Sequence, residues 1–574
     1  MNHLARVATY VATACALLFA ANADAARKAK DLLQYIPEDT PYVMAFTRPL
    51  PNDIMDKFEP GIDKTLSAYK RVMQYQLSET MIELSEKEGG AEEAEQLQVF
   101  MEELMSLMSV QGLRDAGIGR DSLFAAYGDG LLPVFRIALS NSKQFDAAVA
   151  RIEAKATEKL PTATLQGHSY RYVDLDEMRV IIATLKNDAV ITIVPAAYDD
   201  ERLARTLGLT KPRKSLAKSK EFRALNKEYG FTNHFSGFID VERVAAAFVG
   251  DPTGRNQEFL AVTEYDPSMF SEQCKAEFMS LAHVAPRIVM GYTAVKKTYV
   301  ETGMVVELRD DIAAGLATLP AAVPGLGPDL GGLFSFGMSL DPMALRSFYE
   351  SRLDAMEAEP FVCELLAELQ AGTEKGRAAL AQPVPPVVYS FRGFLANVTN
   401  IEGMDIATQT PPSSIDASML VAVENAEALV AMATIFSPEI AALNLLPDGK
   451  ARLLQLPQLA EIADQAFAAL SSGGLAVSLG EGGDTNAEAM LAADVADEKP
   501  FMSVAFDAKR YYEFIGQAAM EGDDSEEGEE VPMALRAAIR DAMVSSGEMY
   551  ERMAFNVHFT DRGVEVSTRL TLAD

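Results

Sequence analysis

The amino-acid sequence predicts an α+β protein made of two tandem duplicated modules, each an antiparallel sheet packed with helices and carrying a helical pair near its start. Three observations lead to this prediction. Stretches of alternating apolar residues flank short turns, which is typical of antiparallel strands. Stretches with apolar residues at helical spacing lie between them. Several of these stretches recur in the same order in the second half of the chain, and 49% hydrophobic residues are enough for large cores.

The N-terminal residues have the pattern of an export signal. An apolar run follows Arg6, and residues 23–25 (Ala-Asp-Ala) supply the small-x-small pattern that signal peptidase recognises. We therefore expect a signal peptide over 1–25, cleavage between Ala25 and Ala26, and a periplasmic or secreted mature protein. A retained anchor is the alternative, but the run is shorter than the ~20 residues that a spanning helix needs. No later apolar run reaches that length, so we expect no transmembrane anchoring after processing.

The chain is strongly acidic. It has 83 Asp and Glu residues against 51 Lys and Arg, a formal net charge of −32. Such a surface repels nucleic acid and favours cationic partners, so we expect no nucleic-acid partner. The most acidic stretch, EGDDSEEGEE at 521–530, predicts a solvated, mobile loop. Weak binding of divalent cations and docking of a basic partner are the functional alternatives for this loop.

Two predicted β-hairpins carry the clearest sign of duplication. The earlier reads RIVMGYTAVKKTYVETGMVVEL from Arg287, and the later reads RMAFNVHFTDRGVEVSTRLTL from Arg552. In both, apolar residues alternate along one arm, the chain turns at charged residues, and the alternation returns along the second arm. This is the pattern of two antiparallel strands with one face on a core.

Three further pairs of segments match in the same order. They are FSGFIDVERVAAAF at 235–248 with FMSVAFDAKRYYEF at 501–514, IALSNSKQFDAAV at 137–149 with VAVENAEALVAMA at 421–433, and YVMAFTRPLPNDIMDKF at 42–58 with FSFGMSLDPMALRSFYE at 334–350. We therefore expect a first module over 26–320 and a second over 321–574. Two such modules favour a two-lobed body with a cleft between the lobes, which is a common place for ligands.

Each opening strand is followed by a predicted helical pair. A methionine stripe at Met101, Met105 and Met108 belongs to the first pair, and we interpret it as core, with a groove for a hydrophobic ligand as the alternative. In the second pair, Glu359-Pro360 separates the two helices. Polar residues at the strand-to-helix junctions are better explained as helix N-caps than as a catalytic set; they are Asn141, Asp240, Asp341 and Asp507.

The first module also resembles a known family. SLFAAYGDG, PVFRIALSNSKQFDAAVARIEA, VIIATLKNDAVITIVPAAYDDERL and SLAKSKEFRALNKEYGFTNHFSGFIDVERV follow one another, and residues 37–42 read Pro-Glu-Asp-Thr-Pro-Tyr just after the expected signal. In this arrangement the chain resembles the secreted bacterial family catalogued as domain of unknown function 3352. The resemblance covers most of the mature chain and is strongest from about 31 to 250. It implies an exported protein, and it brings no activity, cofactor or site residues.

Two cysteines, Cys274 and Cys363, remain after Cys15 leaves with the expected signal. Cysteines of an exported chain can pair in an oxidising compartment, so we mark Cys274 and Cys363 as a tentative disulfide. Each lies in an amphipathic, helical stretch, where a buried free thiol is an equally natural alternative.

The sequence contains no motif with recognisable chemistry. The five histidines include no pair at metal-ligand spacing, and neither H-E-x-x-H nor G-x-S-x-G occurs. The glycine-rich stretch at 323–332 lacks a following Lys-Ser or Lys-Thr and is better explained as a linker. We therefore predict no catalytic residue, no cofactor and no metal site. A hydrolase with an unfamiliar site would need a histidine beside a hydroxyl or carboxylate, for which His234 and His168 are the first candidates.

These observations favour an exported, non-catalytic protein that binds a partner or associates with the cell envelope. An envelope protein and an apolar small molecule are the possible partners. Two alternatives stay open. One is a carrier of a lipid-like apolar ligand, which would need a continuous cavity lined by methionine and leucine. The other is an exported hydrolase with a non-standard site.

Overall fold

The protein is described by a computed structural model over residues 32–573, except 86–97, 100, 104, 156–158, 250, 251, 253, 263, 264, 266, 405–411, 437–442, 456–462 and 522–532. The predicted signal peptide, with its cleavage site at Ala25 and Ala26, lies outside the described residues. So does all but the first residue of the acidic stretch 521–530.

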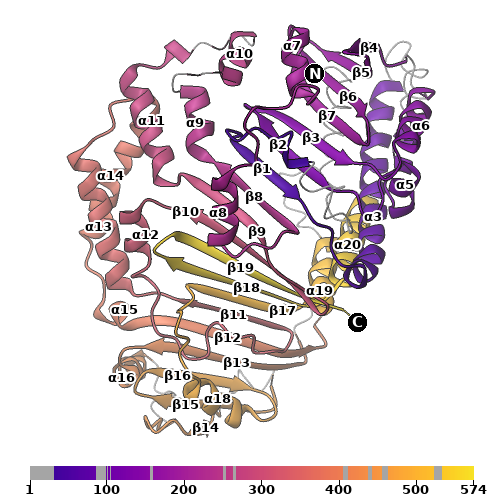
Figure 1. The fold of residues 1–574 in the computed structure, drawn as a ribbon. Helices are drawn as coiled ribbons and strands as arrows, with labels where there is room; N and C mark the ends of the chain where they lie inside the picture. The colour runs from indigo at the N-terminus through magenta and orange to yellow at the C-terminus, as the bar shows by residue number, and fades with distance from the viewer. Residues whose placement is uncertain are drawn as a thin grey trace.

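The fold is mixed α+β, as predicted, and the described residues form one antiparallel sheet of 19 strands at its centre (Figure 1). The strands are β1 (Tyr42–Phe46), β2 (Phe124–Asp129), β3 (Leu132–Ala138), β4 (Thr162–Leu165), β5 (His168–Leu175), β6 (Met178–Leu185), β7 (Asp188–Pro195), β8 (Phe235–Asp240), β9 (Arg287–Lys296), β10 (Tyr299–Glu307), β11 (Phe334–Ser339), β12 (Phe391–Glu402), β13 (Ser414–Val423), β14 (Ala451–Leu453), β15 (Ala466–Ser471), β16 (Gly474–Leu479), β17 (Met502–Asp507), β18 (Tyr550–Thr560) and β19 (Gly563–Leu572).

The helices connect these strands mostly at their ends. They are α3 (Asn52–Ser85), α5 (Val110–Asp115), α6 (Ser142–Glu153), α7 (Asp200–Thr206), α8 (Lys220–Glu228), α9 (Val241–Val249), α10 (Gly254–Val262), α11 (Glu272–Val284), α12 (Asp310–Leu316), α13 (Pro342–Ala358), α14 (Ala367–Leu380), α15 (Pro386–Ser390), α16 (Ala426–Phe436), α18 (Gly483–Ala492), α19 (Ala508–Glu521) and α20 (Met533–Gly547), with 3₁₀ turns η2 (Pro267–Met269) and η3 (Glu364–Leu366). The predicted break at Glu359-Pro360 lies where α13 ends.

The pairing order of the strands reads alike from either side of one central pair. On one side the order is β6-β7-β3-β2-β1-β8-β9-β10, and on the other it is β15-β16-β13-β12-β11-β17-β18-β19. The central pair is β10 with β19, which runs from Tyr299–Thr571 to Glu307–Gly563 without a register shift. The hairpins and segments that match in sequence therefore occupy matching places in the sheet.

The β10–β19 ladder changes the expected shape. We expected two lobes with a cleft between them, but continuous backbone hydrogen bonding joins the two halves of the chain into a single sheet (Figure 1). The reason is that each half ends in a long hairpin whose outer strand is unpaired within that half. Pairing those two strands with each other satisfies both rows of backbone donors and acceptors at once.

Packing distinguishes the two faces of the sheet. Phe222 and Leu225 of α8 pack with Val43, Phe238 and Val289 in a large core, which defines the α8 face. Because side chains alternate along a strand, their neighbours in sequence lie on the opposite face. That face is covered near one end of β10 and β19 by Met55 and Phe58 of α3, with other α3 residues, and we call it the α3 face.

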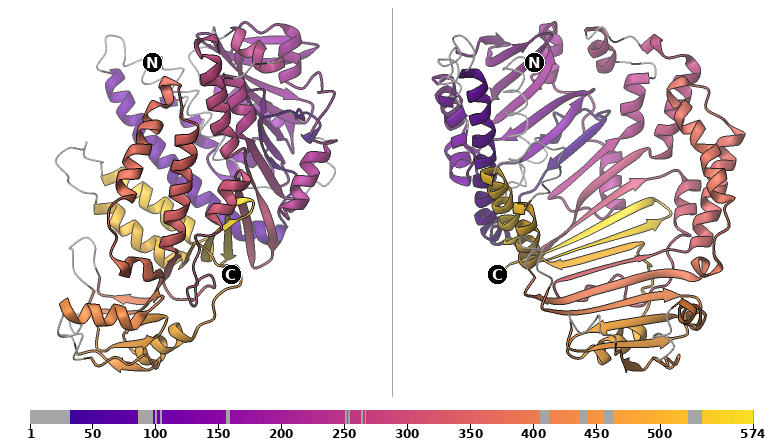
Figure 2. Two further views of the ribbon diagram at one scale, coloured as in Figure 1. Left: turned by 90° about the vertical axis from the view of Figure 1, so that its left-hand side faces the viewer. Right: turned by 180° about the vertical axis from the view of Figure 1, so that it is seen from behind.

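Two groups of helices stand along the sheet (Figure 2). The α3 wall consists of α3, α19 and α20, and the α14 wall consists of α9, α11, α13 and α14. Each wall combines helices from both halves of the chain, since α3, α9 and α11 precede residue 320 and the others follow it. The helices that follow the matching strands β1 and β11 thus pack against elements of the opposite half.

Local sequence signals account for several helix starts. The side chain of Asn141 accepts hydrogen bonds from the backbone N–H groups of Lys143 and Gln144, and Asp341 does the same for α13. Asp240 and Asp507 accept from N–H groups three residues on, at Arg243 and Arg510. The N-cap prediction for these four residues is confirmed.

The methionine stripe is core. Met101, Met105 and Met108 are buried together and pack with Met73 and Leu77. The core interpretation of this stripe is confirmed, and the stripe does not line an open groove.

Candidate functional site

The most unusual surface is a row of apolar side chains that crosses the α3 face. Directly paired residues on neighbouring strands share a face, so a row can be followed from strand to strand. Starting at β1 and passing Gly237 of β8, this apolar row consists of Met44, Met290, Met304, Val566, Val557, Met502, Met338 and Phe394. It therefore continues without interruption from the first half of the chain into the second.

A second row runs beside it on the same face. Its members lie two residues along each strand and are Tyr292, Thr302, Thr568, Phe555, Val504, Phe336, Ala396 and Met419. Aromatic rings connect the two rows, since the ring centroids of Phe336 and Phe394 lie 5.4 Å apart in an edge-to-face arrangement. The apolar surface is therefore wider than one side chain.

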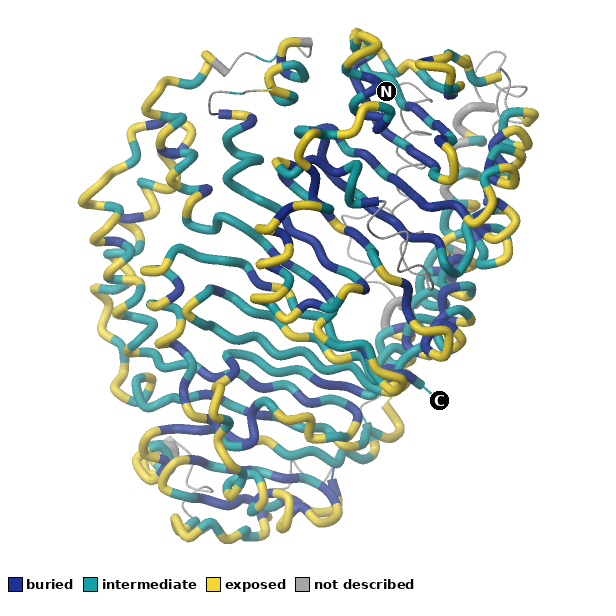
Figure 3. The backbone as a smooth tube through the Cα atoms, viewed as in Figure 1, coloured by how far each residue is buried: buried dark blue, intermediate teal, exposed yellow. Residues whose placement is uncertain are grey.

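This surface is not packed like a core. Met304 is 38% exposed, Met44 37% and Met419 44%. Strand β18 has a paired neighbour on each side, yet none of its residues is buried. Figure 3 shows the same intermediate burial along β9, β10, β18 and β19. An apolar face of this extent usually marks a binding surface, because soluble proteins seldom leave one uncovered.

The opposite face is polar on the central strands β18 and β19, although its continuation over β8, β9 and β10 is core. On β18 and β19 it carries Asn556, His558, Glu565 and Ser567, and Arg569 forms an ion pair with Glu301 of β10 at 3.5 Å. Burial lowers the pKa of His558, while Glu498 and Glu565 oppose this effect. Alternation along β18 and β19 therefore places polar side chains on this face and apolar side chains on the α3 face.

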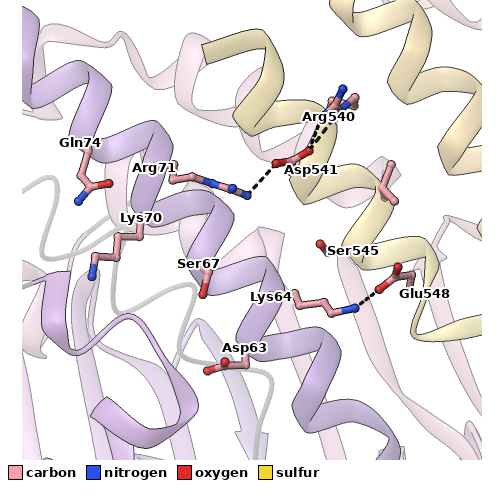
Figure 4. A pocket seen from close by; sticks show the side chains of 11 residues that line it. Asp63, Lys64, Ser67, Lys70, Arg71, Gln74, Arg540, Asp541, Ser545 and Glu548 are labelled. Carbon is pink, nitrogen blue, oxygen red and sulfur yellow. Dashed lines mark hydrogen bonds and ion pairs between the residues drawn. The ribbon is translucent and has the colours of Figure 1, made fainter. Parts of the chain in front are cut away.

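The α3 wall borders the apolar row on one side. Near the sheet it is apolar, where Ile62 and Leu66 of α3 pack with Met549. Farther along, α3 and α20 enclose a polar hollow of about 840 Å³ (Figure 4). Its lining consists of Asp63, Lys64, Ser67, Lys70, Arg71, Gln74, Arg540, Asp541, Val544, Ser545 and Glu548.

Ion pairs cross this hollow between the two halves of the chain. Lys64 pairs with Glu548, and Arg71 pairs with Asp541 at 3.0 Å. All four side chains are at least one-third exposed, so each pair contributes about 0–1 kcal/mol. Most of the charged side chains that line the hollow are already paired between α3 and α20. The hollow is therefore better explained as a contact between these two helices than as an anion-binding site.

The α14 wall has a covalent joint. Cys274 of α11 and Cys363 are bonded in a disulfide with Cα atoms 4.8 Å apart. One turn farther along α11, the carboxylate of Glu277 accepts hydrogen bonds from the backbone N–H groups of Val362 at 3.0 Å and Cys363 at 2.9 Å. The structure contains the disulfide that the sequence analysis marked as tentative. The two cysteines are therefore not free thiols in this structure.

The histidines do not form a hydrolase site among the described residues. His234 is buried beside the backbone of Arg48 and Pro49, and burial lowers its pKa. His168 begins β5, far along the sheet from the apolar row. The imidazole of His283 contacts Glu242, but this pair is exposed on α11 and α9. Within the described parts of the chain, no cluster of three metal-ligating side chains is present either.

One buried carboxylate has a structural explanation. Burial raises the pKa of Asp129, and an ion pair with Arg255 and a 2.6 Å hydrogen bond from Thr206 oppose this rise. The three residues connect the end of β2 to α7 and α10. Asp129 therefore connects β2, α7 and α10. In the order of the sheet, β2 lies on the other side of β1 from the strands that carry most of the apolar row.

Sequence reasoning missed the apolar row itself. The alternation along each strand was visible, and we interpreted each alternating face as packed against a core. The row depends on pairings between residues far apart in the chain, such as Met304 with Val566. The enrichment of methionine on matching strands was the one sequence signal that pointed to it.

Comparisons with protein families and curated proteins assign no function to this surface. No family model matches the chain, and no curated protein matches it significantly. Among the helices of the described residues, none combines the length and the apolar character that crossing a bilayer requires.

Proposed function

We propose that this protein is an exported, non-catalytic carrier that binds a lipid-like apolar molecule along the apolar row. One observation carries the proposal: a partly exposed row of methionine, valine and phenylalanine side chains that continues across the sheet from one half of the chain into the other. The carrier expected from the sequence had a continuous cavity lined by methionine and leucine. The surface that supports the proposal is instead an open face, and methionine suits it because its flexible thioether adapts to irregular partners.

The dimensions of the row favour a long hydrocarbon chain. From β1 to β12 it crosses nine strands, so a spacing of ~4.8 Å gives a length of roughly 40 Å. Each methylene removed from water contributes about 0.8 kcal/mol. Ten methylenes would therefore contribute about 8 kcal/mol, enough to exceed the lower range of association costs, about 4–15 kcal/mol. A small apolar molecule with few methylenes would not bind measurably.

Export and duplication are part of the same proposal. The signal pattern over 1–25 and a disulfide compatible with an oxidising compartment support export. The mirrored strand order supports a duplication with modules at 26–320 and 321–574. The sequence resemblance to the secreted family of domain of unknown function 3352 is consistent with both, and we retain that family membership as a proposal.

A fluorescent fatty acid tests the binding surface directly. We would titrate 11-(dansylamino)undecanoic acid into the processed chain and into two variants that differ by one position on β19. Val566→Glu places a carboxylate in the apolar row, whereas Ser567→Glu places it on the opposite face. We expect Val566→Glu to weaken binding at least ten-fold, equivalent to ~1.4 kcal/mol, and Ser567→Glu to leave the affinity unchanged.

The same experiment has a clear negative outcome. Equal affinities for the two variants, with unchanged circular dichroism, would show that the dye binds elsewhere and would refute the proposed site. Native mass spectrometry of protein recovered from the exported fraction then identifies a bound molecule by its excess mass. Protein that carries no ligand and binds none of the dye would contradict the carrier function.

A further inference from the structure

A second apolar surface lies on the α14 wall, away from the apolar row. Val362 is 71% exposed, Leu365 66% and Leu369 48%. Val362 lies two residues before η3, Leu365 lies within η3, and Leu369 lies near the start of α14. Their spacing of three and four residues is that of one side of a helix. Leu366 and Thr373 of the same segment are buried and face inward. We call the outward stripe of Val362, Leu365 and Leu369 the α14 ridge.

The structure leaves the α14 ridge uncovered. Continuing the same spacing leads to Gly372, where an added Cβ would meet nothing within 4 Å. Met269, in the 3₁₀ turn that precedes α11, is 71% exposed as well. The Cys274–Cys363 disulfide brings the first turn of α11 beside the ridge, which places Met269 at the same end of the wall.

The ridge is held in a fixed conformation. In addition to the disulfide, Glu277 accepts hydrogen bonds from the N–H groups of Val362 and Cys363, and the N–H of Phe361 donates to the side chain of Gln370 at 3.1 Å. An apolar stripe fixed by a covalent bond and buried hydrogen bonds has already lost much of its conformational entropy. Binding to it therefore costs less than binding to a flexible segment.

The stretch of chain that carries the ridge is acidic. The segment from 353 to 374 contains no Lys or Arg. Glu364 and Glu368 are exposed one turn apart beside the ridge leucines, and neither forms an ion pair with another described residue. An apolar stripe with free carboxylates along one side is complementary to an apolar stripe with ammonium or guanidinium groups along its side.

We propose that the α14 ridge docks a basic amphipathic helix of a partner protein. The ridge presents apolar side chains over about two helical turns, roughly 10 Å, which matches the i, i+3, i+7 anchors of a helical ligand. An anionic membrane surface would be repelled by the free carboxylates. A second copy would place its own Glu364 and Glu368 against the same carboxylates, so self-association through this ridge is unfavourable as well.

Synthetic helices provide the probe. We would measure the binding of an 18-residue Leu/Lys amphipathic peptide and of its Leu/Glu counterpart to the processed chain by isothermal titration calorimetry. About 18 residues provide five helical turns, enough to cover the ridge. The lysine peptide should bind and the glutamate peptide should not, because the ridge carboxylates attract the first and repel the second. Leu365→Ser with Leu369→Ser should reduce the affinity at least ten-fold. Glu364→Lys with Glu368→Lys should do the same and reduce the salt dependence.

Matched variants separate docking from general attraction to an acidic protein. Glu481→Lys with Asp484→Lys changes the net charge equally at another exposed site, and Leu446→Ser removes a leucine that is 50% exposed elsewhere. Both should leave peptide affinity within about two-fold, and all ridge variants should retain binding of the dansyl fatty acid. Equal losses in the ridge and control variants would overturn the proposal.

Two other occupants have distinct readouts. Ridge-dependent binding to phosphatidylcholine vesicles, with no peptide binding, would assign the surface to lipid. A dimer that Leu365→Ser with Leu369→Ser converts to a monomer would assign it to a second copy of the chain. Either result would replace the proposed helical partner.

Discussion

Glu277 is a residue whose ionisation makes the α14 wall sensitive to pH. Its carboxylate receives a hydrogen bond from the side chain of Gln273 and two N–H groups from 362–363, and these bonds hold its pKa below the ordinary value of 4.5. A lowered pKa in the folded state means that ionised Glu277 stabilises the fold. This contribution is complete above the unfolded pKa and is lost as pH falls through the folded pKa.

The variant Glu277→Gln tests this linkage. At neutral pH we expect a lower free energy of unfolding than in the parent chain, because one backbone N–H loses its acceptor. The difference between the two proteins should begin to shrink as the pH falls below about 4.5, where Glu277 protonates in the unfolded parent chain, and should be lost as the pH falls through the lower pKa of the folded state. Urea unfolding at a series of pH values measures it. A difference that stays constant down to pH 3 would show that the carboxylate does not titrate in the way stated.

Individual residues were predictable where their function is local. The N-cap at Asp341 needs only the three residues that follow it, and the sequence contains them. Glu277 was not predictable, since its partners at 362–363 are supplied by another helix pair. The pairing of Cys274 with Cys363 stayed open for the same reason: the sequence gives two cysteines, while only packing brings their Cα atoms together.

At the scale of elements, α3 illustrates how a helix is held on the sheet. Met55 is fully buried between α3 and the strands, in the cluster that contains Val300 and Leu572. Met55→Ala should lower the free energy of unfolding by about 2–5 kcal/mol, the usual cost of a large-to-small change in a core. Ser67→Ala, on the exposed side of the same helix, should change it by less than ~0.5 kcal/mol. Similar effects of the two substitutions in denaturant titrations would contradict the packing of α3.

The disulfide lies in the α14 wall and not in the α3 wall. It closes a sequence separation of 89 residues, so Cys274→Ser with Cys363→Ser should cost about 2–4 kcal/mol of unfolding free energy. We expect hydrogen exchange to accelerate in α11 and at the start of α14, while α3 and α20 keep their protection. Uniform acceleration across both walls would mean that they do not open independently.

Elements were predicted better than their contacts. Alternation identified the hairpins at 287–308 and 552–572, and helical spacing identified the two helices on either side of Glu359-Pro360. Neither pattern specifies which side of a strand will be covered. On β18 the alternating face from Met553 to Phe559 looks like a core face in sequence, yet the helices cover the strand only in part and none of its residues is buried.

The whole molecule depends on a contact that no local pattern contains. Duplication alone suggests two bodies that fold separately. The mirrored order of strands means that β10 and β19 occupy equivalent places and pair with each other across the centre. Continuity of the sheet, and with it the continuity of the apolar row, follows from this one ladder. The same equivalence indicates that one half could pair with a second copy of itself through β10.

Separate expression of the halves tests the ladder. Residues 26–320 alone would leave the nine residues of β10 with an unpaired edge, and residues 321–574 would leave the ten residues of β19 unpaired. Because a long free edge strand recruits another strand, each half should self-associate. Mixing the two halves during expression should instead yield a soluble one-to-one complex that binds the dansyl fatty acid. Light scattering after gel filtration distinguishes these states, and a monomeric, natively folded 26–320 would show that the modules are independent and that the β10–β19 ladder does not make them one structure.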